Sequence, residues 1–506
     1  MAMFAYRTSH RFVLLFVIVA KLVVGRRFSV LRVDVETKNQ LAYLQRAYLN
    51  TTKYDFWKEP TELGDKADIM VEKEVQLPDL LNQLNKRNFT HQIIISDVEA
   101  LIKRRANETI KRRPTHRDPS LNSAQLNFAR YHSFAEMIGF LNGLALGFPD
   151  RVHVQPIGQT HEGKNHLFLA FYLALAHQST SLVGRSRQIP LIKIGTRSSV
   201  AKPAIWIDGG IHAREWVSPA VILYFINQLV TEYDRQPIIR QMVDQLDWYI
   251  APLVNPDGYE FSRSSTDPET RLWRKNRSPL QCSTISTGVF TPPRTQCCQG
   301  VDLNRNFDWF FGQVGSSTDP CSEIYSGVYA FSEPETRAIR DFVTSLNGQL
   351  KTFLTFHSYS QILMFPFGHA SNTYPADVDE LRNTAQRAAY ALQSLYGIKY
   401  TVGTGADTLY PASGGSEDWA KGRMGVKYSF LFELRPDDSV ADGFLLPENQ
   451  IIPTCRETWE AVKTIASQTL RYSGIRPIAQ SVATVRECRD LDGKFWSFED
   501  AFNQLV

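Results

Sequence analysis

The chain has 506 residues, of which 43% are hydrophobic and 21% are charged. This is the composition of a globular protein, and the length exceeds what one domain usually needs. The net charge is only +4 and the basic residues are dispersed, which excludes a basic stripe of the kind that binds nucleic acid. We therefore expect no nucleic-acid partner.

Residues 1–25 have the pattern of a secretory signal peptide. Basic residues precede an apolar run from Phe12 to Ala20, which is too short to span a bilayer. Removal of the signal would leave a secreted chain without a membrane span, and a retained signal anchor is the alternative. Secretion lets the six cysteines pair. It also agrees with four sequons for N-glycosylation, at Asn50, Asn88, Asn107 and Asn276.

Residues 26–117 predict a pro-domain followed by a basic linker. Strand-like alternation at residues 29–35 and 91–95, with an amphipathic helical pattern at 77–84, indicates a small α/β domain. The segment Lys111–Arg117 then combines clustered basic residues with a proline. Such a segment is either a solvated linker or a site for a trypsin-like or furin-like protease, so we expect an activating protease as a partner.

Residues 118–472 alternate helix-like and strand-like stretches. This predicts an α/β domain with a mixed, largely parallel central sheet that helices cover on both faces. The strand-like stretches are 204–208, 248–252 and 352–356, and the helix-like ones are 133–141, 221–230 and 333–346. Sites in such sheets gather at the carboxyl ends of strands. His212 and His357 both follow such an end.

Two segments do not fit this alternation. Residues 165–187 contain an apolar run, 167–176, that is too short to cross a membrane. This insertion is either a real loop or an artefact of splicing or gene prediction, and it could prevent the chain from folding. The tail, residues 473–506, is too short for a core of its own, although Cys488 could tether it by pairing with Cys455.

A half-site for a metal follows the strand at 204–208. His212 and Glu215 are spaced i, i+3, so they lie on the same side of one helical turn. An imidazole with a carboxylate is a good ligand set for zinc. The spacing alone also arises by chance in a chain of this length, and a helix-start histidine beside a carboxylate is the alternative.

Seven sequence blocks extend this half-site. They are Pro203–Trp216, Asn255–Tyr259, Trp273–Lys275, Val301–Phe307, His357–Gln361, Tyr410–Ser416 and Phe432–Arg435. With these blocks in this order, residues 28–472 resemble the secreted zinc carboxypeptidases of the pancreatic A/B type, activation domain included. The resemblance implies the carboxypeptidase fold and a zymogen that hydrolyses the C-terminal peptide bond of proteins and peptides. A secreted carboxypeptidase-like protein that binds without cleaving is the rival interpretation.

By this resemblance, one zinc ion is held by His212, Glu215 and His357, with the fourth position open for water. Asp302 would accept the free N–H of His212 and fix its tautomer, although a strand-end cap is the alternative for this residue.

The resemblance also implies the two groups that act on the peptide bond. Glu433 would be the general base, which takes a proton from the attacking water and gives it to the leaving amine. Arg274 would be the cation that stabilises the developing oxyanion. Without the family, Glu433 would be interpreted as a strand-end charge and Arg274 as part of a solvated basic loop.

Recognition of a terminal carboxylate is implied for Asn304 and Arg305, because a planar guanidinium can bind both oxygens. Arg214 and Tyr359 would lie further out along the substrate path. Tyr410 matches the mobile tyrosine that closes over the bound residue.

Glu417 occupies the position that is apolar in A-type and acidic in B-type members of the family. A buried carboxylate without a partner is costly, so Glu417 predicts a preference for C-terminal Lys or Arg. Neutralisation of Glu417 by Lys421, or an A-type preference for apolar residues, is the alternative. Four further residues would line this pocket, with room left by Gly368 and Gly405 and apolar walls from Met364 and Leu409.

The resemblance implies a disulfide between Cys298 and Cys321 around the substrate loop. Cys282 and Cys297 would form a second bridge across an inserted stretch. Because Cys297 and Cys298 are adjacent, the alternative pairing remains open.

Overall fold

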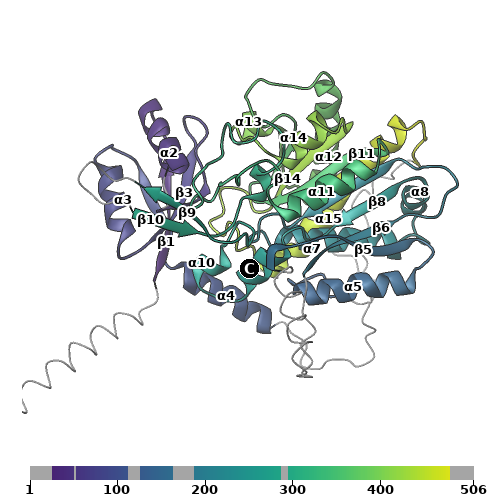
Figure 1. Ribbon diagram of the computed structural model, residues 1–506, viewed down its shortest axis with the longest axis horizontal. Helices are drawn as coiled ribbons and strands as arrows, with labels where there is room; N and C mark the ends of the chain where they lie inside the picture. The colour runs from purple at the N-terminus through teal and green to yellow at the C-terminus, as the bar shows by residue number, and fades with distance from the viewer. Residues whose placement is uncertain (1–25, 51–52, 112–125, 163–186, 286–293, 479–506) are drawn as a thin grey trace, which may run out of the picture.

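The computed structural model describes residues 26–50, 53–111, 126–162, 187–285 and 294–478 (Figure 1). The predicted signal peptide, most of the basic linker, most of the insertion and most of the tail lie outside these ranges.

A small N-terminal domain is built on an antiparallel sheet with the strand order β2-β3-β1-β4. Its strands are β1 (Phe28–Asp34), β2 (Asp55–Lys58), β3 (Lys66–Glu72) and β4 (His91–Ile95), and its helices are α2 (Lys38–Asn50), α3 (Gln76–Asn85) and α4 (Val98–Lys111). The three elements predicted here from the sequence are confirmed as β1, β4 and α3. The other four were not predicted.

The two faces of this small sheet have different partners. One face packs on α2 and α3, through residues such as Leu44 and Leu80. The opposite face carries Trp57 and packs with Phe444 of the large domain, so the two domains share one apolar cluster. The N-terminal domain is therefore docked on the large domain through its own hydrophobic sheet face (Figure 1).

The large domain has an eight-stranded sheet with the order β13-β12-β14-β11-β7-β8-β6-β5. Its strands are β5 (Val152–Gln159), β6 (Gln188–Ile194), β7 (Ala204–Gly209), β8 (Asp247–Ala251), β11 (Leu350–Ser358), β12 (Ile362–Phe365), β13 (Thr401–Thr404) and β14 (Tyr428–Leu434). The central strands β14, β11, β7 and β8 are parallel, whereas β5, β6 and β12 form antiparallel pairs. The predicted mixed, largely parallel sheet is confirmed.

Helices cover both faces of this sheet, as predicted (Figure 1). They are α5 (Phe134–Gly147), α7 (Val217–Thr231), α8 (Pro237–Gln245), α12 (Val378–Tyr396) and α15 (Ile451–Tyr472) on one face, and α11 (Pro334–Ser345) and α14 (Ser416–Gly422) on the other. Side chains of a strand alternate between the faces. In β7, Ile205 and Ile207 join the first cluster and Trp206 joins the second.

Short elements connect these layers near the carboxyl ends of the central strands. They are α9 (Pro256–Arg263), α10 (Pro268–Arg271), β9 (Gln281–Ile285), β10 (Arg294–Cys298), α13 (Gly405–Thr408) and the 3-10 turns Leu303–Arg305 and Glu448–Gln450.

The insertion leaves from the end of a formed hairpin. Strands β5 and β6 pair as far as Gln159 and Gln188. Beyond that pair, the Thr160 amide donates to the Arg187 carbonyl at 3.3 Å, and Arg187 forms a 2.7 Å ion pair with Glu162. Arg187 therefore belongs to the hairpin and not to the insertion predicted at residues 165–187.

The predicted tether between Cys455 and Cys488 is not supported by the position of Cys455. Its side chain is fully buried in the core beneath α15 and is a free thiol. Cys488 lies outside the described residues. A bridge would require the tail to enter a close-packed core, which is costly.

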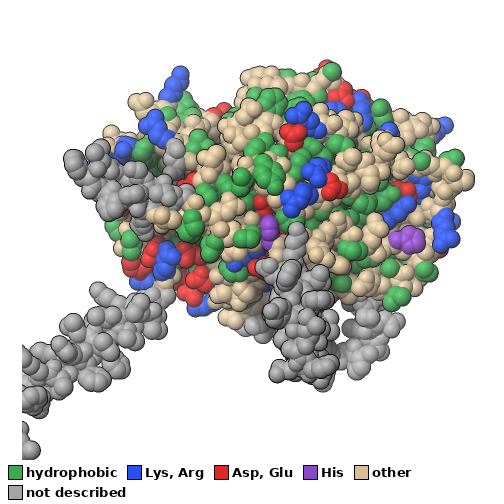
Figure 2. Space-filling view, in the orientation of Figure 1, with side chains coloured by type: hydrophobic (Ala, Val, Ile, Leu, Met, Phe, Trp, Pro, Cys, Tyr) green, Lys and Arg blue, Asp and Glu red, His purple; other side chains and the backbone are tan. Residues whose placement is uncertain are grey.

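The described helices include none that is long and apolar enough to cross a membrane. On the face in Figure 2, basic and acidic side chains are interspersed, and neither sign forms a large patch.

We predict that deleting residues 164–186, which joins Gly163 to Arg187, leaves a folded protein. Thr160 and Glu162, which precede the segment, already contact Arg187, which follows it, and shortening a loop reduces its closure entropy. Thermal unfolding should remain cooperative, with a Tm equal to or above that of the full chain. A Gly/Ser segment of the same length is the control. Loss of cooperative unfolding in the deletion variant alone would contradict this prediction.

Candidate active site

Three potential metal ligands meet at the carboxyl ends of neighbouring strands. His212 and Glu215 follow β7, and His357 lies at the end of β11, which pairs with β7. The His212 Nδ1 atom lies 2.7 Å from Glu215 Oε1 and 3.1 Å from His357 Nδ1, and His357 Nδ1 lies 3.3 Å from Glu215 Oε2. All three side chains are buried, and they form a group that could hold a metal ion.

Hydrogen bonds fix which imidazole atoms face this group. His212 Nε2 lies 3.0 Å from the Asp302 carboxylate, so this nitrogen carries the proton. His357 Nε2 lies 3.2 Å from the Thr355 hydroxyl, which itself donates to Asp208 at 2.7 Å. Both Nδ1 atoms are then acceptors.

At this centre, the lone pairs of hydrogen-bond acceptors therefore face one another with no hydrogen atom between them. Two Nδ1 atoms and the Glu215 carboxylate converge, and the Ser358 amide donates to this carboxylate at 3.2 Å. Buried acceptors that face one another repel unless a proton or a cation lies between them. Two imidazoles and one carboxylate suit zinc, so the residues present fit this ion.

Asp302 links the histidine to Arg274. Its second oxygen accepts from Arg274 Nε at 3.1 Å and Nη2 at 3.0 Å. Burial would raise the pKa of Asp302, but Arg274 and His212 hold it well below its usual range. Arg274 Nη1 lies 3.9 Å from Glu215, so the guanidinium borders the metal ligands. The Ala213 amide donates to the Arg274 carbonyl at 2.9 Å, which fixes the arginine loop to the histidine loop.

Glu433 lies beside His357 because the two residues are register partners on the parallel strands β14 and β11. Its side chain lines the same cavity as the metal ligands. Burial, and then the nearby Glu215 carboxylate, raise the pKa of Glu433 well above its usual range. The raised pKa makes the Glu433 carboxylate a stronger base than an exposed one.

The residues predicted to form the carboxylate clamp line the same cavity. The Asn304 side-chain oxygen accepts from the Ser416 amide at 2.9 Å, which orients its amide group. Arg305 donates to the Gly315 carbonyl at 2.7 Å and to the Tyr410 hydroxyl at 3.0 Å. Tyr410 therefore lies next to Arg305, the residue beside which it was predicted to act.

The N-terminal domain closes this cavity. The cavity, of about 330 Å³, is lined by both domains. Arg214 forms an ion pair with Asp55 of β2, with its Nη1 atom 2.9 and 3.0 Å from the two carboxylate oxygens. The ring of Tyr48 from α2 packs edge-on against Tyr410, with centroids 6.0 Å apart. Tyr359, also predicted along the substrate path, packs against Phe444 at 5.0 Å.

Glu417 lines the same cavity. Its Oε2 atom is buried and accepts no hydrogen bond from the described residues. Burial above all, together with Asp418, raises the pKa of Glu417 to about 8. Lys421 instead binds Asp377 at 2.9 Å, so the alternative in which Lys421 neutralises Glu417 is wrong. The residues predicted to line this pocket all border the cavity: Gly368, Gly405, Met364 and Leu409.

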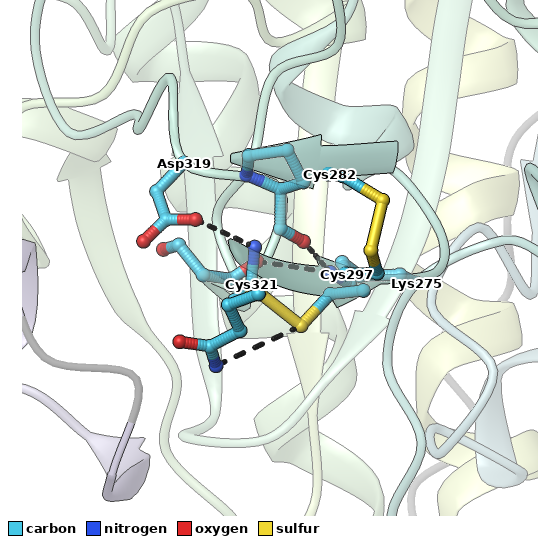
Figure 3. The surroundings of a disulfide bond; sticks show 9 residues. Lys275, Cys282, Cys297, Asp319 and Cys321 are labelled. Carbon is cyan, nitrogen blue, oxygen red and sulfur yellow. Dashed lines mark hydrogen bonds between the residues drawn. A yellow bond between two sulfur atoms is a disulfide. The ribbon is translucent and has the colours of Figure 1, made fainter. Parts of the chain in front are cut away.

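Both predicted disulfides are confirmed (Figure 3). Cys282 pairs with Cys297 and Cys298 pairs with Cys321, so the alternative pairing is wrong. Beside them, the Lys275 ammonium donates to the backbone carbonyls of residues 320 and 322 at 2.8 and 3.1 Å. The bridges and this lysine together fix the loop that follows Arg274.

The prediction that Asn276 accepts a glycan is wrong for the folded chain. Asn276 is completely buried, and its amide nitrogen donates to Glu333 at 2.8 Å and to Glu335 at 3.0 Å. Its oxygen accepts from the amides of Ser278 and Val301. A sequon carries no information on burial, whereas Asn88 and Asn107 are exposed.

Asp55 and Tyr48 were not identified from the sequence. Neither lies in a block that carries the resemblance, and a contact between domains leaves no local spacing signal in either segment.

Two family profiles match the chain. Residues 137–461 match the family described as zinc carboxypeptidase, and residues 31–105 match the carboxypeptidase activation peptide.

Curated relatives extend over most of the chain. Carboxypeptidase A1 of Bos taurus is 37% identical over 440 residues, which cover 86% of this chain and 91% of the relative. Carboxypeptidase A2 of Mus musculus is 38% identical over 411 residues, covering 81% and 86% respectively.

Solved structures agree with these matches. The crystal structure of thrombin activatable fibrinolysis inhibitor has a TM-score of 0.70 at 32% identity, and covers 88% of this chain and 99% of its own. Carboxypeptidase A from Helicoverpa armigera has a TM-score of 0.72 at 25% identity, with coverage of 89% and 99%.

Proposed function

The chain belongs to the zinc carboxypeptidases and carries their activation peptide, and from this membership we propose that it is a secreted zymogen that removes basic residues from the C-termini of proteins and peptides. Its membership makes it a metallocarboxypeptidase, a hydrolase that uses zinc. The observation that carries the proposal is the buried convergence of acceptors at His212, Glu215 and His357, beside Glu433.

We assign the zinc to His212, Glu215 and His357, with Asp302 orienting the first histidine. When bound, zinc supplies a Lewis acid that makes water more acidic and polarises a carbonyl group. Glu433, on the strand next to His357, accepts the proton of the attacking water and returns it to the leaving amine.

Arg274 stabilises the charge that develops on the carbonyl oxygen. Its guanidinium is held by Asp302 through two hydrogen bonds, so it needs little reorganisation during the reaction. A cation fixed in this way stabilises the transition state more than the ground state.

The substrate's terminal carboxylate is bound by Asn304 and Arg305, and Tyr410 closes over it. Arg214 and Tyr359 contact the peptide further from its end. This clamp restricts the enzyme to the last residue, because an internal peptide bond offers no carboxylate for Arg305.

Glu417 selects the last side chain. The Glu417 Oε2 atom is buried without a partner among the described residues, and apolar residues line the cavity beside it. A Lys or Arg side chain brings a positive charge to this oxygen while its aliphatic stem packs on the walls. The relatives named above as carboxypeptidase A favour the second candidate, a preference for apolar residues.

The N-terminal domain, in residues 26–117, inhibits the enzyme until it is removed. Asp55 forms an ion pair with Arg214, and the ring of Tyr48 packs against Tyr410. Side chains of the N-terminal domain therefore block the substrate path. A trypsin-like or furin-like protease that cuts in the basic linker frees the catalytic domain, residues 118–472.

The experiment is to nick the purified protein with trypsin and measure release of C-terminal Lys, Arg, Phe and Leu from peptides, with and without a chelator. Release should appear after nicking and disappear with the chelator. Glu433→Gln should lower kcat by about 10²–10⁴ because the base is lost, whereas Asp379→Asn, at a side chain 95% exposed, should leave it unchanged. A carboxypeptidase-like binding protein would release nothing.

Glu417→Gln keeps the shape of the side chain and removes its charge. We expect kcat/KM for C-terminal Lys and Arg to fall about 100-fold, because the substrate cation would be buried without a partner. Turnover of C-terminal Leu should change little. A wild-type preference for Phe over Lys, or equal turnover of Lys by both proteins, would contradict the role of Glu417.

A further inference from the structure

A second cluster of potential metal ligands lies beside the loop that carries Arg274. It consists of His161, which follows β5, and of Glu333 and Glu335 at the start of α11. One ligand atom from each residue lies within 4.8 Å of those of the other two. The catalytic residues described above are not part of this cluster.

The cluster contains two buried carboxylates side by side. Glu333 and Glu335 are 3% and 0% exposed, and the Asn276 amide nitrogen donates to both, at 2.8 and 3.0 Å. No lysine or arginine in the described ranges forms an ion pair with either carboxylate. Two like charges held this closely in a buried site require a proton or a cation between them.

One of the carboxylate oxygens has no partner. Glu333 accepts three hydrogen bonds, from His161 at 2.8 Å, from Asn276 at 2.8 Å and from the Ser332 hydroxyl at 2.7 Å. Glu335 accepts from Asn276 through one oxygen, while its Oε1 atom is buried and has no hydrogen-bond partner among the described residues.

We propose that His161, Glu333 and Glu335 form a second divalent-metal site, which binds Zn²⁺. One imidazole and two carboxylates are a usual ligand set for this ion. The partly exposed His161, whose side chain is 21% exposed, provides the route of entry. This inference does not depend on the proposed substrate.

The ion would connect three parts of the chain near the active site. His161 belongs to the β5–β6 hairpin, the two carboxylates belong to α11, and Asn276 bonds both carboxylates from the loop that begins at Arg274. Binding would therefore brace the loop that carries Arg274 and Asn276. Its role would be structural, since none of its ligands lines the substrate cavity.

The test is the zinc content of the full-length zymogen after equilibration with buffered Zn²⁺ and removal of free metal, measured by elemental analysis. Wild type should hold two equivalents per chain. Glu335→Gln, which keeps an acceptor for Asn276, should hold one, as should Glu215→Gln in the catalytic site. The double variant should hold none.

His161→Gln, at the accessible edge of the cluster, serves as a second variant in case Glu335→Gln does not fold, and it too should hold one equivalent. Wild type with a single equivalent that Glu215→Gln abolishes would overturn the inference and indicate a water molecule or proton in the cluster. Retention of two equivalents by Glu215→Gln would instead count against the catalytic ligands and leave the second site unaffected.

Discussion

The active site depends on one electrostatic constraint, which is the need for a cation among buried acceptors. His212 and His357 direct Nδ1 toward each other at 3.1 Å because Asp302 and Thr355 occupy their other nitrogens. Glu215 adds negative charge at the same point. The surrounding hydrogen bonds thus prepare a metal centre before any metal binds, which reduces the reorganisation that binding requires.

Much of the site could be predicted because its residues occur in short, distinctive blocks. Each block follows a central strand or forms a loop at its carboxyl end, so a local pattern also reports a position in the fold. The fold class followed from the alternation of apolar stretches, which depends on burial on both sheet faces. These two signals are independent, and both indicated the edge of the sheet where β7, β11 and β14 end.

Features that depend on contacts between distant segments could not be predicted. Asp55 reaches Arg214 only because the small domain docks through Trp57 and its neighbours. Asn276 matched a glycosylation sequon, yet its side-chain amide donates hydrogen bonds to two carboxylates inside the fold. The pairing of Lys421 with Asp377, which leaves Glu417 unpaired, likewise follows from tertiary packing.

The small domain and the active site share a single hydrophobic and ionic interface. Trp57 packs against Phe444, and the guanidinium of Arg214, which pairs with Asp55, lies 4.1 Å from the centre of the Phe444 ring. Exclusion of water strengthens such a pair. Arg214, which is proposed to contact the peptide substrate, therefore also binds the pro-domain.

The most direct measurement is anomalous diffraction at the zinc edge from crystals of the zinc-loaded protein. The account predicts a zinc peak bounded by His212 Nδ1, Glu215 and His357 Nδ1, within about 2.0–2.2 Å of each ligand atom. A zinc-loaded crystal with no peak between these three side chains, while their positions are unchanged, would contradict it.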